Sequence, residues 1–307
     1  MISFFHAGLP TVMGEASENP HYDPTNDLIF KFVFGREERK NVTLSFINAM
    51  TGREGENAFV DLDFQNPELV PDKEDDKLGR LDVFGILDNK TRVDIEMQVF
   101  NHRNMEKRSL FYWAHMYLHF DALKSGQGYR QIKPAIAINI LRFPFLPTEE
   151  PFSQYGIYNI KNRHKLTDDL ELDFLEIPKY KNKPVKDMNR VERWLAYFAN
   201  RLGPAEKEEL AMMNPEIAEA MDASNRFMMD DKAYFEYVQR ESAIWDYNND
   251  MEGSREEGRE EEAQVKTEHF VRNLLAMKVM SHEDIAKAAE TTVDEVERIA
   301  REHATPK

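Results

Sequence analysis

Residues 81–98 have the sequence LDVFGILDNKTRVDIEMQ. An apolar-rich run over residues 81–87 ends in Asp-Asn-Lys at 88–90, a composition typical of turns. Residues 93–99 then alternate strictly between apolar and polar side chains, as a β-strand with two different faces does. Because the connection between the two strands is so short, the sequence predicts an antiparallel hairpin.

This hairpin carries the side chains that we expect to act chemically. Asp82 lies on the first strand, and Glu96 and Gln98 share one face of the second. Since Mg²⁺ prefers oxygen ligands, Asp82, Glu96 and the backbone carbonyl of Met97 form a candidate metal site, and Gln98 is placed to orient an attacking water. Polar residues that alternate along a strand more often simply face water, so the pattern alone leaves both interpretations open.

Two motifs resemble the PD-(D/E)xK nuclease superfamily: GRLDV at 79–83 and VDIEMQ at 93–98. More narrowly, the chain resembles the recombination-promoting nuclease and transposase family of bacteria, over about residues 23–198. Further segments that resemble the family are DLIFKFVFG at 27–35, Arg108 with Tyr112 and Trp113, the stretch 164–179, and Trp194 with Leu195. Each motif alone is unspecific, whereas their order and spacing together are fairly specific.

The resemblance implies a restriction-endonuclease-like core, cleavage of DNA that depends on Mg²⁺ or Mn²⁺, and a role linked to recombination, mobile elements or phage defence. At the matching positions Asp82 and Glu96 would bind the metal, and Gln98 would replace the lysine of the superfamily. Asp27 is a further candidate ligand, because some members place an acidic residue on the first helix. Since Gln98 is neutral, we expect the site to lack the cation that this lysine supplies.

An aromatic-rich helix is expected over residues 108–124. Arg108 lies one turn before Tyr112, and we expect this pair to contact DNA; the alternatives for Arg108 are a solvated charge or a carboxylate partner. His115 and His119 have the i, i+4 spacing that can bind zinc, but the aromatic residues between them favour a helix that packs on a sheet.

The remaining pattern indicates an α/β fold, with a mixed sheet flanked by helices and a helical C-terminal region. A nearly continuous apolar run at 135–141 predicts a strand that is buried on both faces. Further strands are expected at 59–64 and 170–177, and almost everything after residue 189 is expected to be helical. The predicted division is an N-terminal arm at 1–22, a nuclease-like domain at 23–188, a helical region at 189–249, a charged hinge or exposed helix at 250–262, and a small helical tail at 263–307.

Composition excludes several classes of site. The 307 residues include no cysteine, so disulfides, thiol nucleophiles and thiolate metal sites are excluded, and a reducing cytoplasm is the expected location. No apolar stretch approaches the roughly 20 residues that span a bilayer, so we expect no membrane partner.

Charge is unevenly distributed along the chain. The net charge of −16 opposes a nucleic-acid partner, because DNA is a polyanion. Residues 77–142, however, hold 11 Lys and Arg against 6 Asp and Glu, whereas residues 201–262 hold 7 against 18. The segment with the candidate site is therefore basic, and DNA remains the expected partner.

The C-terminal helices have the lengths of a helix-turn-helix motif. Because residues 293–303 present four acidic side chains against two arginines, we expect self-association or a protein partner there rather than reading of DNA bases. The alternative function for the whole chain is a nuclease-like protein without catalytic activity, acting in interaction or regulation.

Overall fold

The computed structural model describes residues 22–66, 68–69, 79–101, 103–119 and 128–304. The predicted arm at 1–22 therefore lies almost entirely outside the described residues. The chain divides into two compact units, Met1–Arg240 and Glu241–Lys307.

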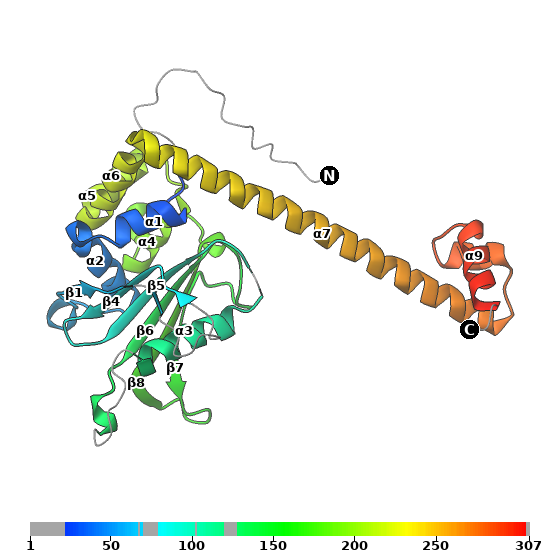
Figure 1. Ribbon diagram of the computed structural model, residues 1–307, viewed down its shortest axis with the longest axis horizontal. Coiled ribbons are helices and arrows are strands. Elements are labelled where there is room, and N and C mark those ends of the chain that lie inside the picture. The colour runs from blue at the N-terminus through cyan, green and yellow to red at the C-terminus, as the bar shows by residue number, and fades with distance from the viewer. Residues whose placement is uncertain (1–21, 67, 70–78, 102, 120–127, 305–307) are drawn as a thin grey trace. The chain divides into compact units, whose positions relative to one another are not determined.

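A mixed sheet of six strands, in the order β1-β4-β5-β6-β8-β7, forms the centre of the first unit (Figure 1). Neighbours β5, β6 and β8 run parallel, and the other neighbouring pairs run antiparallel. Its strands are β1 (Leu62–Phe64), β4 (Val83–Leu87), β5 (Arg92–Gln98), β6 (Ala135–Leu141), β7 (Phe152–Tyr158) and β8 (Lys165–Glu176). A separate two-stranded sheet pairs β2 (Glu68–Leu69) with β3 (Gly79–Arg80). The predicted α/β class, with a mixed sheet flanked by helices, is confirmed.

The predicted hairpin is the antiparallel pair β4–β5, and its register places Val83 opposite Ile95. Every residue of β5 is buried, including the polar ones. One side of β5 enters the main hydrophobic core, and the other lies under helix α3 (Met105–His119). The interpretation that these polar side chains face water is therefore wrong. Strand β6 has the predicted bounds and is buried on both faces, as expected.

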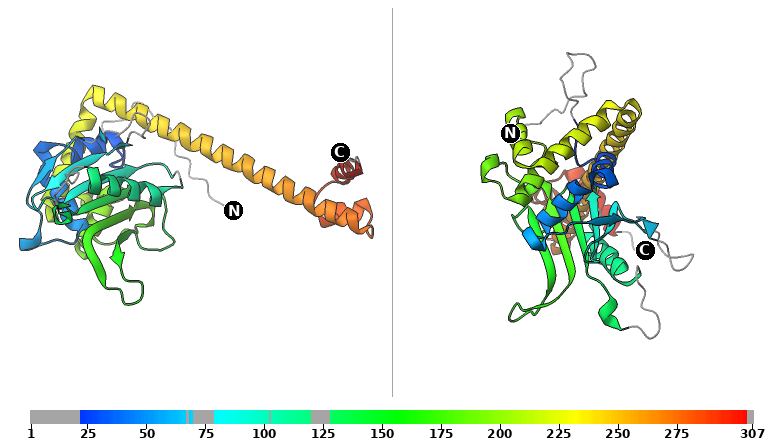
Figure 2. Two further views of the ribbon diagram at one scale, coloured as in Figure 1. Left: turned by 60° about the horizontal axis from the view of Figure 1, so that its bottom comes forward. Right: turned by 90° about the vertical axis from the view of Figure 1, so that its left-hand side faces the viewer.

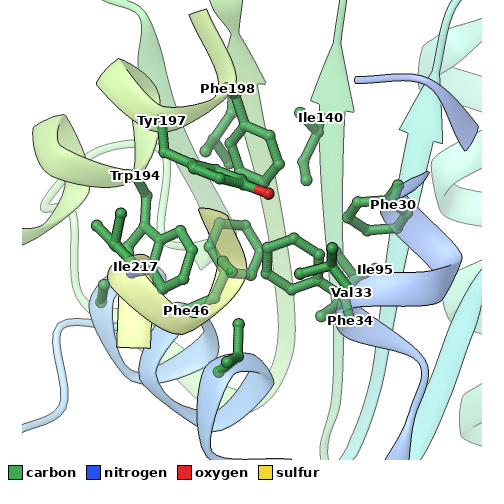
Figure 3. Close-up of a cluster of buried hydrophobic side chains, with 14 of the residues drawn as sticks. Phe30, Val33, Phe34, Phe46, Ile95, Ile140, Trp194, Tyr197, Phe198 and Ile217 are labelled. Carbon is green, nitrogen blue, oxygen red and sulfur yellow. The ribbon is translucent and has the colours of Figure 1, made fainter. Parts of the chain in front are cut away.

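Helices cover the face of the sheet opposite α3 (Figure 1). They are α1 (Asp27–Phe34), α2 (Lys40–Met50), α4 (Arg190–Ala199), α5 (Pro204–Met213) and α6 (Pro215–Met229). Figure 3 shows the aromatic centre of this layer, where Phe34 of α1 and Phe46 of α2 pack against Trp194 and Phe198 of α4. Helices α4, α5 and α6 thus share one core with α1 and α2, because their apolar faces are buried in it.

Two details of the strands and helices differ from the sequence prediction. Strand β7 was not predicted, because its side chains are mostly exposed and it forms by pairing with β8, the hairpin drawn in green in Figure 2. The helical stretch expected after residue 189 is interrupted at Asp230, among other places, and the backbone of Asp230 is extended. The Asp230 carboxylate accepts a hydrogen bond from the Ala233 N–H in the first turn of α7 (Asp231–Met277), so it begins a new helix.

The second unit contains the C-terminal part of α7 with α8 (His282–Ala288) and α9 (Val293–Ala304). Its small core comprises Val271, Ile285, Ala286, Val296 and Ile299. Ser281 caps α8 by accepting a hydrogen bond from the Asp284 N–H. Residues 252–262 are helical and exposed, which agrees with the exposed helix, one of the two predictions for that charged segment.

Arg298 of α9 is bound by three carboxylates, those of Glu295, Glu302 and Glu268. One of the two arginines expected on this helix is therefore already paired within the unit. Among the described helices, none is both long enough and apolar enough to cross a membrane.

Candidate active site

At the open end of β4 and β5, the Asp82 and Glu96 carboxylates each accept a hydrogen bond from a backbone N–H across the hairpin. Asp82 lies one residue before β4, and its Oδ2 accepts a hydrogen bond from the Met97 N–H at 3.0 Å. In the other direction, the Asp82 N–H donates to Oε1 of Glu96 at 3.1 Å. These two hydrogen bonds hold the Asp82 and Glu96 carboxylates side by side.

The backbone of Met97 adds a third oxygen to this group. The β4–β5 register ends at Val83 and Ile95, and beyond it the Met97 N–H donates to Asp82. In a strand, the N–H and C=O of one residue point to the same edge. The Met97 carbonyl therefore faces the edge where Asp82 lies, and its role as a metal ligand stays a prediction.

The other carboxylate oxygen of Glu96, Oε2, is held by two side-chain donors. It accepts hydrogen bonds from Nε2 of Gln98 at 2.6 Å and from Nη2 of Arg108 at 3.2 Å. The Arg108 guanidinium lies 5.0 Å from the centre of the Tyr112 ring, and Tyr112 is buried. Of the alternatives for Arg108, the structure contains the carboxylate partner. Contact of Arg108 and Tyr112 with DNA stays a prediction.

Three acidic side chains, those of Asp82, Asp94 and Glu96, are crowded together at this end of the hairpin. Burial and, next, the Asp82 carboxylate raise the pKa of Glu96 to about 8, while Arg108 acts in the opposite direction. Burial, followed by the Glu96 and Asp82 carboxylates, raises the pKa of Asp94 well above its ordinary value. Neither carboxylate oxygen of Asp94 has a hydrogen-bond partner among the described residues. Carboxylates crowded in this way are stabilised by positive charge.

Helix α1 brings a lysine to the site. Nζ of Lys31 lies 2.8 Å from Oδ1 of Asp82. The expectation that the site lacks a cation is therefore wrong, because the cation comes from a helix distant in sequence rather than from the strand that carries Gln98. A signal was present: Lys31 follows Asp27 by four residues, which places both on one face of α1.

Asp27 reaches the same site but is already paired. Its Oδ1 accepts a hydrogen bond from Nε of Arg240, at the start of α7, at 2.8 Å. No local pattern connected these two residues, which are 213 positions apart. A cavity of about 290 Å³ joins the groups, and its lining includes Asp27, Lys31, Asp82, Met97, Gln98, Arg108 and Arg240. The structure thus brings together the predicted site residues around one opening, with Glu96 and Tyr112 directly behind Arg108 and Gln98.

The available ligands fit a hard divalent cation. Two carboxylates and a backbone carbonyl leave the remaining positions to water and phosphate oxygens, which is typical of Mg²⁺. Within the described part of the chain, no cluster of three or more His, Cys, Asp or Glu side chains forms a metal site. His115 and His119, whose spacing could bind zinc but whose surroundings favour a packing helix, cannot be compared, because the side chain of His119 lies outside the described residues.

Comparison with known proteins places this geometry in context. The family model described as PD-(D/E)XK nuclease family transposase matches residues 24–254. No curated protein and no solved structure matches the chain.

Proposed function

The chain belongs to the PD-(D/E)XK nuclease family transposases, and from this premise we propose that it is a DNA endonuclease that depends on Mg²⁺ or Mn²⁺. One observation carries the proposal. The Asp82 and Glu96 carboxylates and the Met97 carbonyl converge at one end of the hairpin, beside a cavity. We further propose that this activity serves recombination, mobile elements or phage defence.

Asp82, Glu96 and the Met97 carbonyl would hold the cation, and Asp27 would join them if it left Arg240. When bound, the cation supplies charge stabilisation to the phosphate and activates water near neutral pH. Gln98 donates to Glu96 and lines the cavity, so it orients both that carboxylate and an attacking water. Arg108 fixes Glu96 from the side of α3 and presents positive charge toward the cavity that would receive a DNA phosphate.

The C-terminal unit has a different proposed role. Because Arg298 is paired with three glutamates, α9 offers little positive charge to DNA, and we propose self-association or a protein partner for this unit.

Plasmid cleavage by purified protein tests the activity. We expect cleavage with Mg²⁺ or Mn²⁺ and loss of cleavage when a chelator is added. Asp82→Ala and Glu96→Ala should also lose cleavage at nearly unchanged melting temperature, because each substitution removes one of the two carboxylate ligands. Glu149→Ala, at an exposed position, is the matched control and should cleave like the wild type.

Cleavage at the wild-type rate by Asp82→Ala would overturn the site. A wild-type protein that binds DNA equally well with and without divalent cations and never cleaves it would instead favour the alternative, a nuclease-like interaction or regulatory protein.

A further inference from the structure

Lys31 is placed where the chemistry of the site requires a cation. The strand that carries Glu96 continues to Gln98, which is neutral, so the end of this strand brings no positive charge to the site. Lys31 reaches the same carboxylates from α1, with its ammonium 2.8 Å from Oδ1 of Asp82. Its side chain is 38% exposed and lines the cavity, so the ammonium faces the opening as well as Asp82.

The position of Lys31 is fixed by the core beneath α1. Ile29, Phe30, Val33 and Phe34 are fully buried on the inner side of this helix. With that side held, the face that carries Lys31 cannot turn away from the hairpin without exposing apolar side chains. The lysine is therefore presented by a rigid element rather than by a mobile loop.

The other two cations of the cavity are bound to other carboxylates. Arg108 donates to Glu96 and stacks on Tyr112, and Arg240 donates to Asp27. Lys31 is the cation of the cavity lining that is paired with Asp82. A bound divalent cation would therefore have to share the Asp82 carboxylate with Lys31.

We propose that Lys31 is a catalytic residue that stabilises the charge developing on the phosphate, and that in the metal-free protein it neutralises Asp82. This inference rests on the proposed function. In hydrolysis, the oxygen of a water forms a bond to phosphorus and releases a proton to solvent. The bond from phosphorus to the leaving oxygen breaks, its electron pair stays on that oxygen, and a solvent proton completes the hydroxyl group. The Lys31 ammonium keeps its proton throughout and acts through charge and hydrogen bonding.

The role predicts opposite effects on catalysis and on metal binding. Lys31→Gln should lower the single-turnover rate of DNA cleavage by about 10²-fold, the scale on which an electrostatic donor contributes. The same change removes a positive charge beside Asp82, so affinity for Mn²⁺ alone, measured by calorimetry without DNA, should rise by roughly tenfold. Lys186→Gln, at an exposed position, is the matched control and should change neither quantity.

Exchanging the side chains at positions 31 and 98 distinguishes a catalytic role of Lys31 from a structural one. Lys31→Gln combined with Gln98→Lys returns a cation to the same cavity from the strand, and should recover at least about tenfold of the rate lost in Lys31→Gln. If Lys31 only supported the fold, the exchange would not restore cleavage, and the affinity for Mn²⁺ would fall or stay constant.

The outcomes distinguish the two proposals. If the wild type cleaves, Asp82→Ala does not, and Lys31→Gln cleaves at the wild-type rate, the role of Lys31 is overturned and the nuclease stands. If the wild type fails to cleave with either metal, the nuclease is overturned and the catalytic role of Lys31 with it. Weaker binding of Mn²⁺ by Lys31→Gln at unchanged melting temperature overturns the neutralisation of Asp82.

Discussion

Gln98 differs from the charged residues of the site because it can only donate and accept hydrogen bonds. Its amide donates to Glu96 at 2.6 Å, and its side chain lines the cavity. A neutral amide can hold a carboxylate and a water in place, but it adds no charge to the transition state. Its contribution should therefore appear in the rate more than in the binding of metal.

We predict that Gln98→Ala lowers the single-turnover rate by about 10²-fold, the scale for losing a positioning group. Its affinity for Mg²⁺ should change much less than that of Asp82→Ala, since Gln98 is not a proposed ligand. Gln98→Lys should keep or raise the rate, because it adds a cation at the position where the superfamily has lysine. The measurement is single-turnover cleavage across a Mg²⁺ titration. An unchanged rate in Gln98→Ala would show that its amide only fills space on β5.

Asp173 provides a second test at the residue scale, away from the candidate metal ligands. It lies on β8 beside Glu171, and burial followed by the Glu171 charge raises its pKa well above the ordinary value. The folded protein thus keeps this carboxyl group protonated at a pH where the unfolded chain has lost the proton. Its contribution to stability is therefore lost as pH rises from about 4 toward the raised pKa.

We predict that Asp173→Asn is more stable than the wild type near neutral pH, because an amide of the same shape does not ionise. The gain should be small at pH 4.5 and should grow toward pH 7.5, by up to about 1.4 kcal/mol for each pH unit between the two pKa values. Thermal unfolding across that pH range measures it. Asp187→Asn, at an exposed position, is the control. A gain that is constant with pH would contradict burial of a neutral carboxyl group.

Helix α1 connects the core to the site at the scale of a single element. Its cap is Asn26, a fully buried residue whose Oδ1 accepts hydrogen bonds from the Leu28 and Ile29 N–H groups. The next residue is Asp27, and Lys31 follows one turn later. The start of the helix therefore fixes the register of both side chains that α1 sends to the cavity.

We predict that Asn26→Ala lowers the free energy of unfolding by about 1 to 2 kcal/mol, the usual effect of losing a cap. For a unit of this size the melting temperature should fall by roughly 2 to 8 °C. Asn26→Asp keeps an acceptor at the cap and should retain more of the stability. Equal melting temperatures for Asn26→Ala and the wild type, in thermal unfolding followed by circular dichroism, would rule out this capping role.

At the scale of the whole molecule, the C-terminal unit carries a net negative charge, and the first unit contains the basic segment of the chain. Residues 250–307 contain 15 Asp and Glu against 9 Lys and Arg, whereas the basic segment at 77–142 belongs to the first unit. DNA affinity depends on cations near phosphates, and a negative segment weakens binding through repulsion.

We predict that truncation after Tyr247 leaves DNA affinity unchanged or increases it, because the compact unit Met1–Arg240 remains whole while net negative charge is removed. Fluorescence anisotropy with a labelled duplex, at matched salt and without divalent cations, measures the affinity. A melting temperature close to that of the full chain establishes that the truncated protein is folded. A large loss of affinity would assign DNA contacts to the C-terminal unit.

The sequence by itself determined the features that depend on neighbouring residues. The β4–β5 hairpin and the bounds of β6 follow from local patterns of polarity and turn chemistry, and the structure contains both. Alternation along β5 also placed Glu96 and Gln98 on one face, where a hydrogen bond now joins them.

Only the tertiary structure decided how that face is used. Helix α3 covers this face, so its polar side chains are buried rather than in contact with water. Helices α1 and α7 bring Lys31 and Arg240 to the cavity. Strand β7 likewise exists through its pairing with β8. Periodicity along a chain specifies which side chains share a face of a strand. The helices and charges that contact this face come from segments distant in sequence, and they are brought there because burial of the common hydrophobic core stabilises that arrangement.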